Sequence, residues 1–143
     1  MSQYFSLGDV TLWNPSNGVS ALFLRQTAGF EEVLGLPSGI GPMEEDEAEV
    51  APDSLAVFVG ALLAWRDGSN HAVLEALSDG FIATMLVLAE RAGAEVRWPG
   101  QPGPAQAGLH DVQVAPETTA GAGAGWAVRV REQARQLDLA MAR

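Results

Sequence analysis

Residues 71–93 read HAVLEALSDGFIATMLVLAERAG, and this stretch decides the fold. Its apolar side chains recur at the three- and four-residue spacing of a helix, and Gly93 is a typical C-terminal stop. The first half is amphipathic, but from Phe81 onward the segment is apolar nearly all round, which is typical of a buried helix. The pattern predicts a central core helix from His71 to about Ala92. Gly80 in its interior costs about 1 kcal/mol relative to alanine, and we expect a kink or a close helix crossing there.

Two further helices are predicted before this one. The first begins at Asn14-Pro15-Ser16-Asn17 and ends at Gly35 and Pro37, which are a capping start and a glycine–proline stop. Its expected apolar face consists of Val19, Leu22, Phe23, Gln26, Phe30, Val33 and Leu34. The second begins at Pro52-Asp53-Ser54 and ends at the turn 67–70. Its expected apolar face consists of Leu55, Phe58, Val59, Leu62, Leu63 and Trp65.

The two ends of the chain differ from this helical centre. Residues 3–13 place β-prone runs on either side of Gly8-Asp9, which favours an extended segment or a small hairpin. Residues 98–125 are rich in Pro, Gly and Ala and are interpreted as a linker with one short strand at 109–114. Residues 126–143 return to helical spacing. We therefore expect a mainly α fold: a compact helical core domain (1–97), the linker (98–125) and a basic amphipathic tail helix (126–143). Minor β elements are expected near the N-terminus and at 46–50 or 109–114.

Composition narrows the function classes. A chain of 143 residues corresponds to one domain, and the lack of cysteine excludes a disulfide scaffold, a thiolate metal site and a cysteine nucleophile. The formal net charge of −10 disfavours binding to nucleic acid. No signal peptide is visible, and the longest dense apolar run, 81–89, is shorter than the roughly 20 residues that cross a bilayer. We expect a soluble, cytoplasmic protein that binds no membrane.

Charge is distributed unevenly along the chain. The tail carries Arg129, Arg131, Arg135 and Arg143 against two carboxylates, whereas the rest of the chain has four arginines against sixteen carboxylates. One interpretation is that the tail helix docks on its own body near the acidic run. The other is that its arginines engage an anionic or protein partner, including a second copy in a homo-oligomer formed through the tail helix.

The acidic run Glu44-Glu45-Asp46-Glu47-Ala48-Glu49 is the most conspicuous candidate binding surface. In an extended chain Glu45, Glu47 and Glu49 share one face, because side chains alternate with a period of two. Three such carboxylates could bind a divalent cation or hold a proton as a general acid. The spacing matches no calcium loop, however, and no histidine is close in sequence. We predict no metal site and treat a solvated acidic loop as the more common outcome.

A second candidate lies on the central helix, where His71, Glu75 and Asp79 follow one another at four-residue intervals on one face. A histidine–carboxylate pair at the mouth of an apolar pocket can do acid–base work or supply two or three metal ligands. The alternative is a polar helix end that faces outward. No nucleophile elbow, dinucleotide fingerprint or phosphate-binding loop is present, so we predict no cofactor.

The residues Ser2-Gln3-Tyr4-Phe5, Leu7-Gly8-Asp9 and 11–18 (TLWNPSNG) resemble the opening of a family of small actinomycete proteins of unknown function. The likeness continues through 36–42, 77–81 and 90–93 and covers residues 2–96, which leaves the linker and tail as additions or a variable end. The resemblance implies a source and a compartment, but it carries no catalytic residues over to this chain.

These observations favour a non-catalytic protein-binding role. The chain would be an accessory, regulatory or immunity-type protein that engages a protein partner through its acidic surface. The alternative is a small cofactor-independent enzyme or small-molecule binder, of cyclase or isomerase type, in a biosynthetic pathway. In that case His71, Glu75 and Asp79, or the carboxylates of 44–49, would serve as acid and base.

Overall fold

The computed structural model describes residues 1–100 and 118–143. In this part of the chain four helices dominate: α1 (Asn17–Leu34), α2 (Pro52–Asp67), α3 (Ala72–Arg91) and α4 (Thr118–Ala140). Three short strands, β1 (Tyr4–Leu7), β2 (Val10–Trp13) and β3 (Glu47–Glu49), form one sheet. The prediction of a mainly helical fold with a minor β element near the N-terminus and a C-terminal helix is confirmed. The strand expected at 109–114 lies outside the described residues. The tail helix begins at Thr118, ahead of the expected Trp126.

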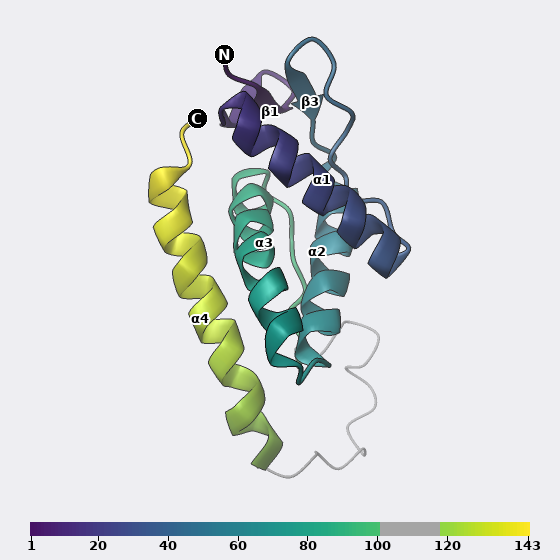
Figure 1. Cartoon of the computed structure of the whole chain (residues 1–143), viewed down its shortest axis with the longest axis vertical. Helices are drawn as coiled ribbons and strands as arrows, with labels where there is room; N and C mark the ends of the chain where they lie inside the picture. Colours follow the sequence, from purple (N-terminus) through teal and green to yellow (C-terminus); the bar gives the residue numbers. More distant parts are fainter. Residues whose placement is uncertain (101–117) are drawn as a thin grey trace.

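The helix α3 lies at the centre of the molecule. Figure 1 shows it between α2 and α4, with α1 crossing in front of α2 and α3, and it packs directly against both of its neighbours. Its observed bounds agree with the predicted helix, since His71 is the N-cap residue and Ala92 the C-cap residue. The half that begins at Phe81 is buried on most sides, as its uniformly apolar sequence predicts.

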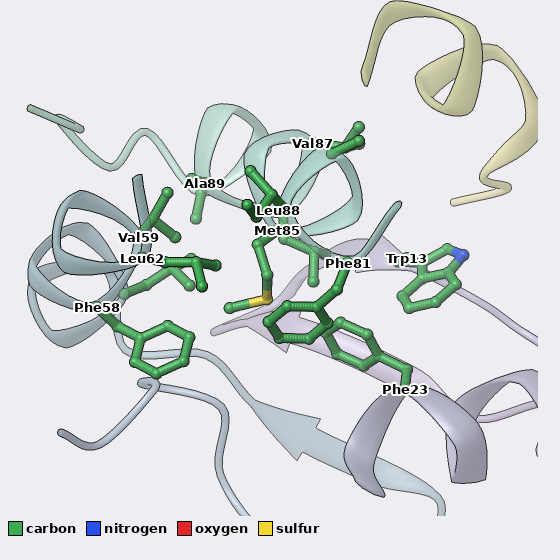
Figure 2. Packing of buried hydrophobic residues seen from close by; sticks show 14 of the residues in the cluster. Trp13, Phe23, Phe58, Val59, Leu62, Phe81, Met85, Val87, Leu88 and Ala89 are labelled. Carbon is green, nitrogen blue, oxygen red and sulfur yellow. The ribbon is translucent and has the colours of Figure 1, made fainter. Parts of the chain in front are cut away.

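The core is built around that half of α3. In Figure 2 the side chains of Phe81 and Met85 lie among residues of α1 and α2, including Phe23 and Phe58. The rings of Phe30 and Phe81 stack with their centroids 4.5 Å apart, and Phe23 lies edge-on to both Phe5 and Trp13. Such offset and edge-to-face pairs add about 0.5–1.5 kcal/mol each beyond the area they bury. The aromatic residues thus join α1, α3 and the sheet in one core.

The sheet has the strand order β2-β1-β3. The predicted hairpin is present: β1 and β2 are antiparallel and turn at Gly8, which has a φ of 56°. The strand β3 pairs with β1 in parallel and lies at one edge of the sheet, opposite β2. Along β3 the side chain of Ala48 is buried while Glu47 and Glu49 are exposed. The sheet therefore presents carboxylates to solvent along the edge that β3 forms.

The apolar face of α1 differs from the prediction. The helix packs through Ser20, Phe23 and Thr27, whereas Val19, Leu22 and Val33 are exposed. The apolar residues of α1 span an arc wider than the stripe that one helix buries against the layer beneath it. Thr27 can lie in the buried stripe because its hydroxyl donates to the carbonyl of Phe23 at 2.9 Å. An apolar strip along the outer side of α1 is consequently left uncovered.

One helix in the described part of the chain, α3, is long and apolar enough to cross a membrane. This criterion uses only length and composition, and core helices of soluble proteins also meet it. In this chain α3 packs against α2 and α4 and supplies the centre of the core. Its apolar character is therefore consistent with a soluble protein.

Candidate functional site

A buried arginine organises the end of α2. Arg66 is only 2% exposed and continues the buried helical stripe of Leu55, Val59 and Leu62. Its Nε donates to Asp79 Oδ1 at 2.6 Å and its Nη2 to Asp79 Oδ2 at 3.3 Å, while its Nη1 donates to Glu75 Oε1 at 3.4 Å. The fork of the guanidinium matches the two oxygens of a carboxylate, so Asp79 is held by two parallel bonds.

The tail helix completes this cluster. The guanidinium carbon of Arg66 lies 4.8 Å from the ring centroid of Trp126, and the indole Nε1 of Trp126 donates to Asp67 Oδ1 at 3.0 Å. Trp126 is itself buried. The electron-rich face of an indole ring attracts a cation that lies over it, most strongly where water is excluded. Arg66 therefore joins α2, α3 and α4 at one point.

The candidate triad on α3 is divided by this arrangement. Glu75 and Asp79, whose side chains are 31% and 26% exposed, both pair with Arg66. His71 is exposed and caps the helix, since its Nδ1 accepts from the backbone N–H of Leu74 at 3.4 Å. In the described part of the chain no group of three histidine, aspartate or glutamate side chains is placed to hold a metal ion. The arrangement fixes helices in place and does not bring the histidine to the two carboxylates as an acid–base pair.

A second arginine performs the same task at the other end of α3. Arg91 Nε donates to Asp138 Oδ1 at 2.9 Å, and Nη2 donates to the carbonyls of Asp138 and Met141, each at 2.9 Å. Its Nη1 donates to the carbonyl of Leu12 in β2 at 2.6 Å. The backbone N–H of Asn14 also donates to the carbonyl of Ala142. The C-terminal end of α4 is thus tied to α3 and to the sheet.

The tail helix therefore docks on α3 of its own chain, away from the acidic run. Arg129, Arg131 and Arg135 are all exposed, and among the described residues none of them forms an ion pair with the body. The guanidinium of Arg131 lies 3.9 Å from the ring centroid of Trp98, and Arg135 pairs with Glu132 one turn earlier. No ion pair among the described residues joins an arginine of α4 to the carboxylates of 44–49. The charges that dock the tail are arginines of the body, which sequence analysis did not single out.

The acidic run forms a tight turn that leads into β3. Glu44 and Glu47 exchange both backbone hydrogen bonds, at 2.9 Å each, and the two residues between them have positive φ: 49° at Glu45 and 66° at Asp46. Positive φ at both central residues is the geometry of a type I′ turn, which normally carries Asn-Gly. Of the three carboxylates predicted to share a strand face, only Glu47 and Glu49 lie in the strand, and Glu45 lies in the turn.

This acidic turn borders a hollow of about 710 Å³, which is lined by Pro42, Glu44, Glu45, Glu47 and Glu49. Two of the run's carboxylates are used internally: Glu49 Oε1 accepts from the N–H of Gly8 at 2.9 Å, and Asp46 Oδ1 accepts from Gln3 Nε2 at 3.2 Å. Glu44, Glu45 and Glu47 have no ion pair among the described residues. The turn therefore offers three free carboxylates on a fixed backbone.

A second hollow, of about 460 Å³, lies between α1 and the C-terminal end of α4. No charged side chain lines it, although the chain carries a net charge of −10. Its walls include Val19, Leu22 and Gln26 of α1 and Leu137 and Ala140 of α4. Apolar or uncharged polar groups are the ones that such a lining accepts.

The chain was compared with known proteins at three levels. The model of a family of unknown function (DUF6086) matches residues 1–143. The match includes the tail, which the sequence resemblance left as an addition or a variable end. The comparisons with curated proteins and with solved structures found no match. The family match thus covers both the helical body and the helix that docks on it.

Proposed function

The chain belongs to this family of unknown function, and we propose from its own residues that it is a non-catalytic, protein-binding accessory or regulatory protein, of which an immunity-type protein is one form. Its binding surface is the acidic turn 44–47 with the adjoining strand β3. The partner is a protein that presents basic side chains, because the free groups of the turn are carboxylates.

The backbone of the turn carries this proposal. A residue other than glycine in the left-handed region costs about 1 kcal/mol, and Glu45 and Asp46 both occupy it. Asn-Gly would fit the same turn with less strain. Asp46 accepts a hydrogen bond from Gln3, but stability alone does not account for Glu45 at this position, whereas display of its carboxylate on a fixed turn does.

A catalytic role for the α3 residues has less support. Both carboxylates of that group are paired with Arg66, and His71 caps the helix instead of facing them. A general acid or base must reach the proton that it transfers. We further propose a cytoplasmic location, which the absence of cysteine supports, and an actinomycete source, which the sequence resemblance supports.

The turn itself provides the decisive variant. The double substitution Glu45→Asn with Asp46→Gly removes two negative charges and relieves the strained geometry. Because it also removes the hydrogen bond from Gln3 to Asp46, the fold should become more stable by only about 0.5 kcal/mol. Tagged wild-type and variant chains are used to capture proteins from cells of the native host, and the captured proteins are compared by mass spectrometry. We expect the variant to lose the partner although it is more stable than the wild type.

The matched control removes two exposed charges elsewhere, by Asp9→Asn with Glu90→Gln. This control should keep the partner. Equal capture by wild type and turn variant, or equal loss in both variants, contradicts the proposal. So does a wild-type chain that captures no protein but gains stability from a small molecule.

One observation favours the alternative of a small-molecule binder. The hollow between α1 and α4 is uncharged, and its volume of about 460 Å³ lies within the range of roughly 300–1,000 Å³ typical of ligand pockets. Because no acidic or basic group lines it, a molecule there would be held without acid–base catalysis by the lining. A thermal-shift screen with neutral metabolites tests this alternative, and Leu22→Arg should abolish any stabilisation found.

A further inference from the structure

We propose that the outer side of α1 is a contact surface between two copies of this chain, which pack their α1 helices antiparallel about a two-fold axis. The surface consists of Val19, Leu22, Gln26, Gly29 and Val33, hereafter the outer α1 strip, with Arg25 and Glu32 along its rim. This proposal is independent of the acidic turn, which lies on a different element.

The outer α1 strip has the spacing of a helix–helix contact. Its members follow one another at intervals of three and four residues, so they form a single row along the helix. Leu22 is 61% and Val33 59% exposed, and in Figure 1 no other helix lies in front of α1. The space above Gly29 is open, which allows a second helix to approach the backbone closely. The outer α1 strip therefore offers apolar side chains, and a glycine without a side chain, to a partner helix.

The outer α1 strip is complementary to the same strip of a second copy that runs antiparallel to it. If Gln26 of one copy lies beside Gly29 of the other, the same register places Leu22 beside Val33 of the second copy. Leu22 and Val33 then each have an apolar partner, and the two-fold axis makes this contact twice, whereas Val19 lies opposite position 36 of the second copy, beyond the end of α1. A self-complementary patch of this kind is what an isologous dimer requires.

The rim charges select the same register. Arg25 and Glu32 lie on one side of the strip, both are exposed, and neither has an ion pair among residues 1–100 and 118–143. In the antiparallel arrangement Arg25 faces Glu32 of the second copy, and the axis repeats the pair. The rim is therefore neutral overall, so two chains that each carry a net charge of −10 can meet there without placing like charges opposite each other.

The second copy is expected on α1 and not on the tail helix. The side of α4 that carries Trp126 and Val130 is already covered by α3, and both side chains are buried there. By contrast, the strip on α1 continues into the uncharged hollow beside the end of α4, which extends the apolar surface available to a partner helix.

The test is sedimentation velocity of the full chain over a range of concentrations at physiological salt. We expect the wild type to dimerise and Leu22→Asp and Val33→Asp to remain monomeric. Two matched controls place the same substitution at equally exposed sites on α3: Leu77→Asp, where the wild-type side chain is 72% exposed, and Val73→Asp, where it is 60% exposed. Both controls should dimerise like the wild type. Circular dichroism verifies that each variant is folded.

A charge swap tests the register. Arg25→Glu alone and Glu32→Arg alone place like charges opposite each other twice, and each should weaken the dimer about tenfold. The double variant restores both pairs with their signs exchanged and should recover wild-type affinity. A wild type that is monomeric throughout, a dimer that survives Leu22→Asp, a dimer lost in the α3 controls, or a double variant as weak as the single ones overturns the proposal. A monomer that instead binds a neutral apolar dye at the strip overturns it in favour of a small ligand.

Discussion

The docking of the tail helix depends on Trp126, and its removal is the most informative single change to the fold. Trp126 is buried, packs against Trp98 with ring centroids 6.3 Å apart, and lies under the guanidinium of Arg66. Replacing a buried tryptophan by alanine costs about 3–5 kcal/mol. Trp126→Phe keeps a ring for Arg66 but loses the hydrogen bond to Asp67. Because Asp67 is exposed, that loss should cost only about 1 kcal/mol.

These costs can be separated by urea unfolding followed by far-ultraviolet circular dichroism. A loss of 3–5 kcal/mol is a large part of the 5–15 kcal/mol that stabilises a typical domain. Leu139→Ala is the control on the same helix, since that side chain is 85% exposed and its removal should cost less than about 0.5 kcal/mol. A double-mutant cycle of Trp126→Ala with Arg66→Met should give a coupling energy of about 1 kcal/mol for the cation over the ring. A cost below about 1 kcal/mol for Trp126→Ala would refute the docking of α4 described above.

Three further predictions use the same unfolding assay or a thermal shift. Arg91→Leu leaves the carbonyl of Leu12 and the carbonyls at the end of α4 without their donor, and should lower the free energy of unfolding by about 2–4 kcal/mol. Asp138→Ala removes an exposed partner of Arg91 and should lower it by about 1 kcal/mol or less. Equal losses in the two variants would contradict this ranking. Gly80→Ala should stabilise the fold by about 0.5–1 kcal/mol, because a Cβ there meets only Gln133 Nε2, at 3.8 Å. Gly39→Ala should destabilise it by more than about 2 kcal/mol, because the new Cβ would lie 2.6 Å from the backbone nitrogen of Leu55. A stabilising Gly39→Ala with a destabilising Gly80→Ala would contradict the packing described above. Saturating Ca²⁺, Mg²⁺, Mn²⁺ or Zn²⁺ should leave the melting temperature unchanged; a stabilisation near 2.7 kcal/mol at 100 times the dissociation constant would indicate a cation site.

Periodicity was sufficient to predict the helices and their order. The uniform apolar character after Phe81 indicated the central position of α3, and Gly8-Asp9 indicated the hairpin. Periodicity does not state how wide a stripe a neighbouring layer will cover. For that reason Val19, Leu22 and Val33 belong to the apolar face predicted for the first helix although they are exposed.

The two arginine clusters were missed for a different reason. An arginine on a helix is ordinarily read as a surface residue, because burying its charge requires partners that sequence does not reveal. A signal was nevertheless present at Arg66, which follows Leu55, Val59 and Leu62 at helical spacing. The carboxylates Glu75 and Asp79 were singled out correctly as a pair on one face, but their partner came from another helix. Register between distant elements, such as Arg91 with Met141, has no local trace in the sequence.

The position of α4 has a consequence for how the chain is made. Arg91, at the C-terminal end of α3, finds its partners Asp138 and Met141 47 and 50 residues further along the chain. While a ribosome is still adding those residues, the side of α3 that α4 will cover remains open to water and to other chains. A nascent chain therefore exposes this side of α3 until residues 126–141 have been added, and we expect a chain stopped before residue 126 to be a preferred substrate for chaperones and proteases.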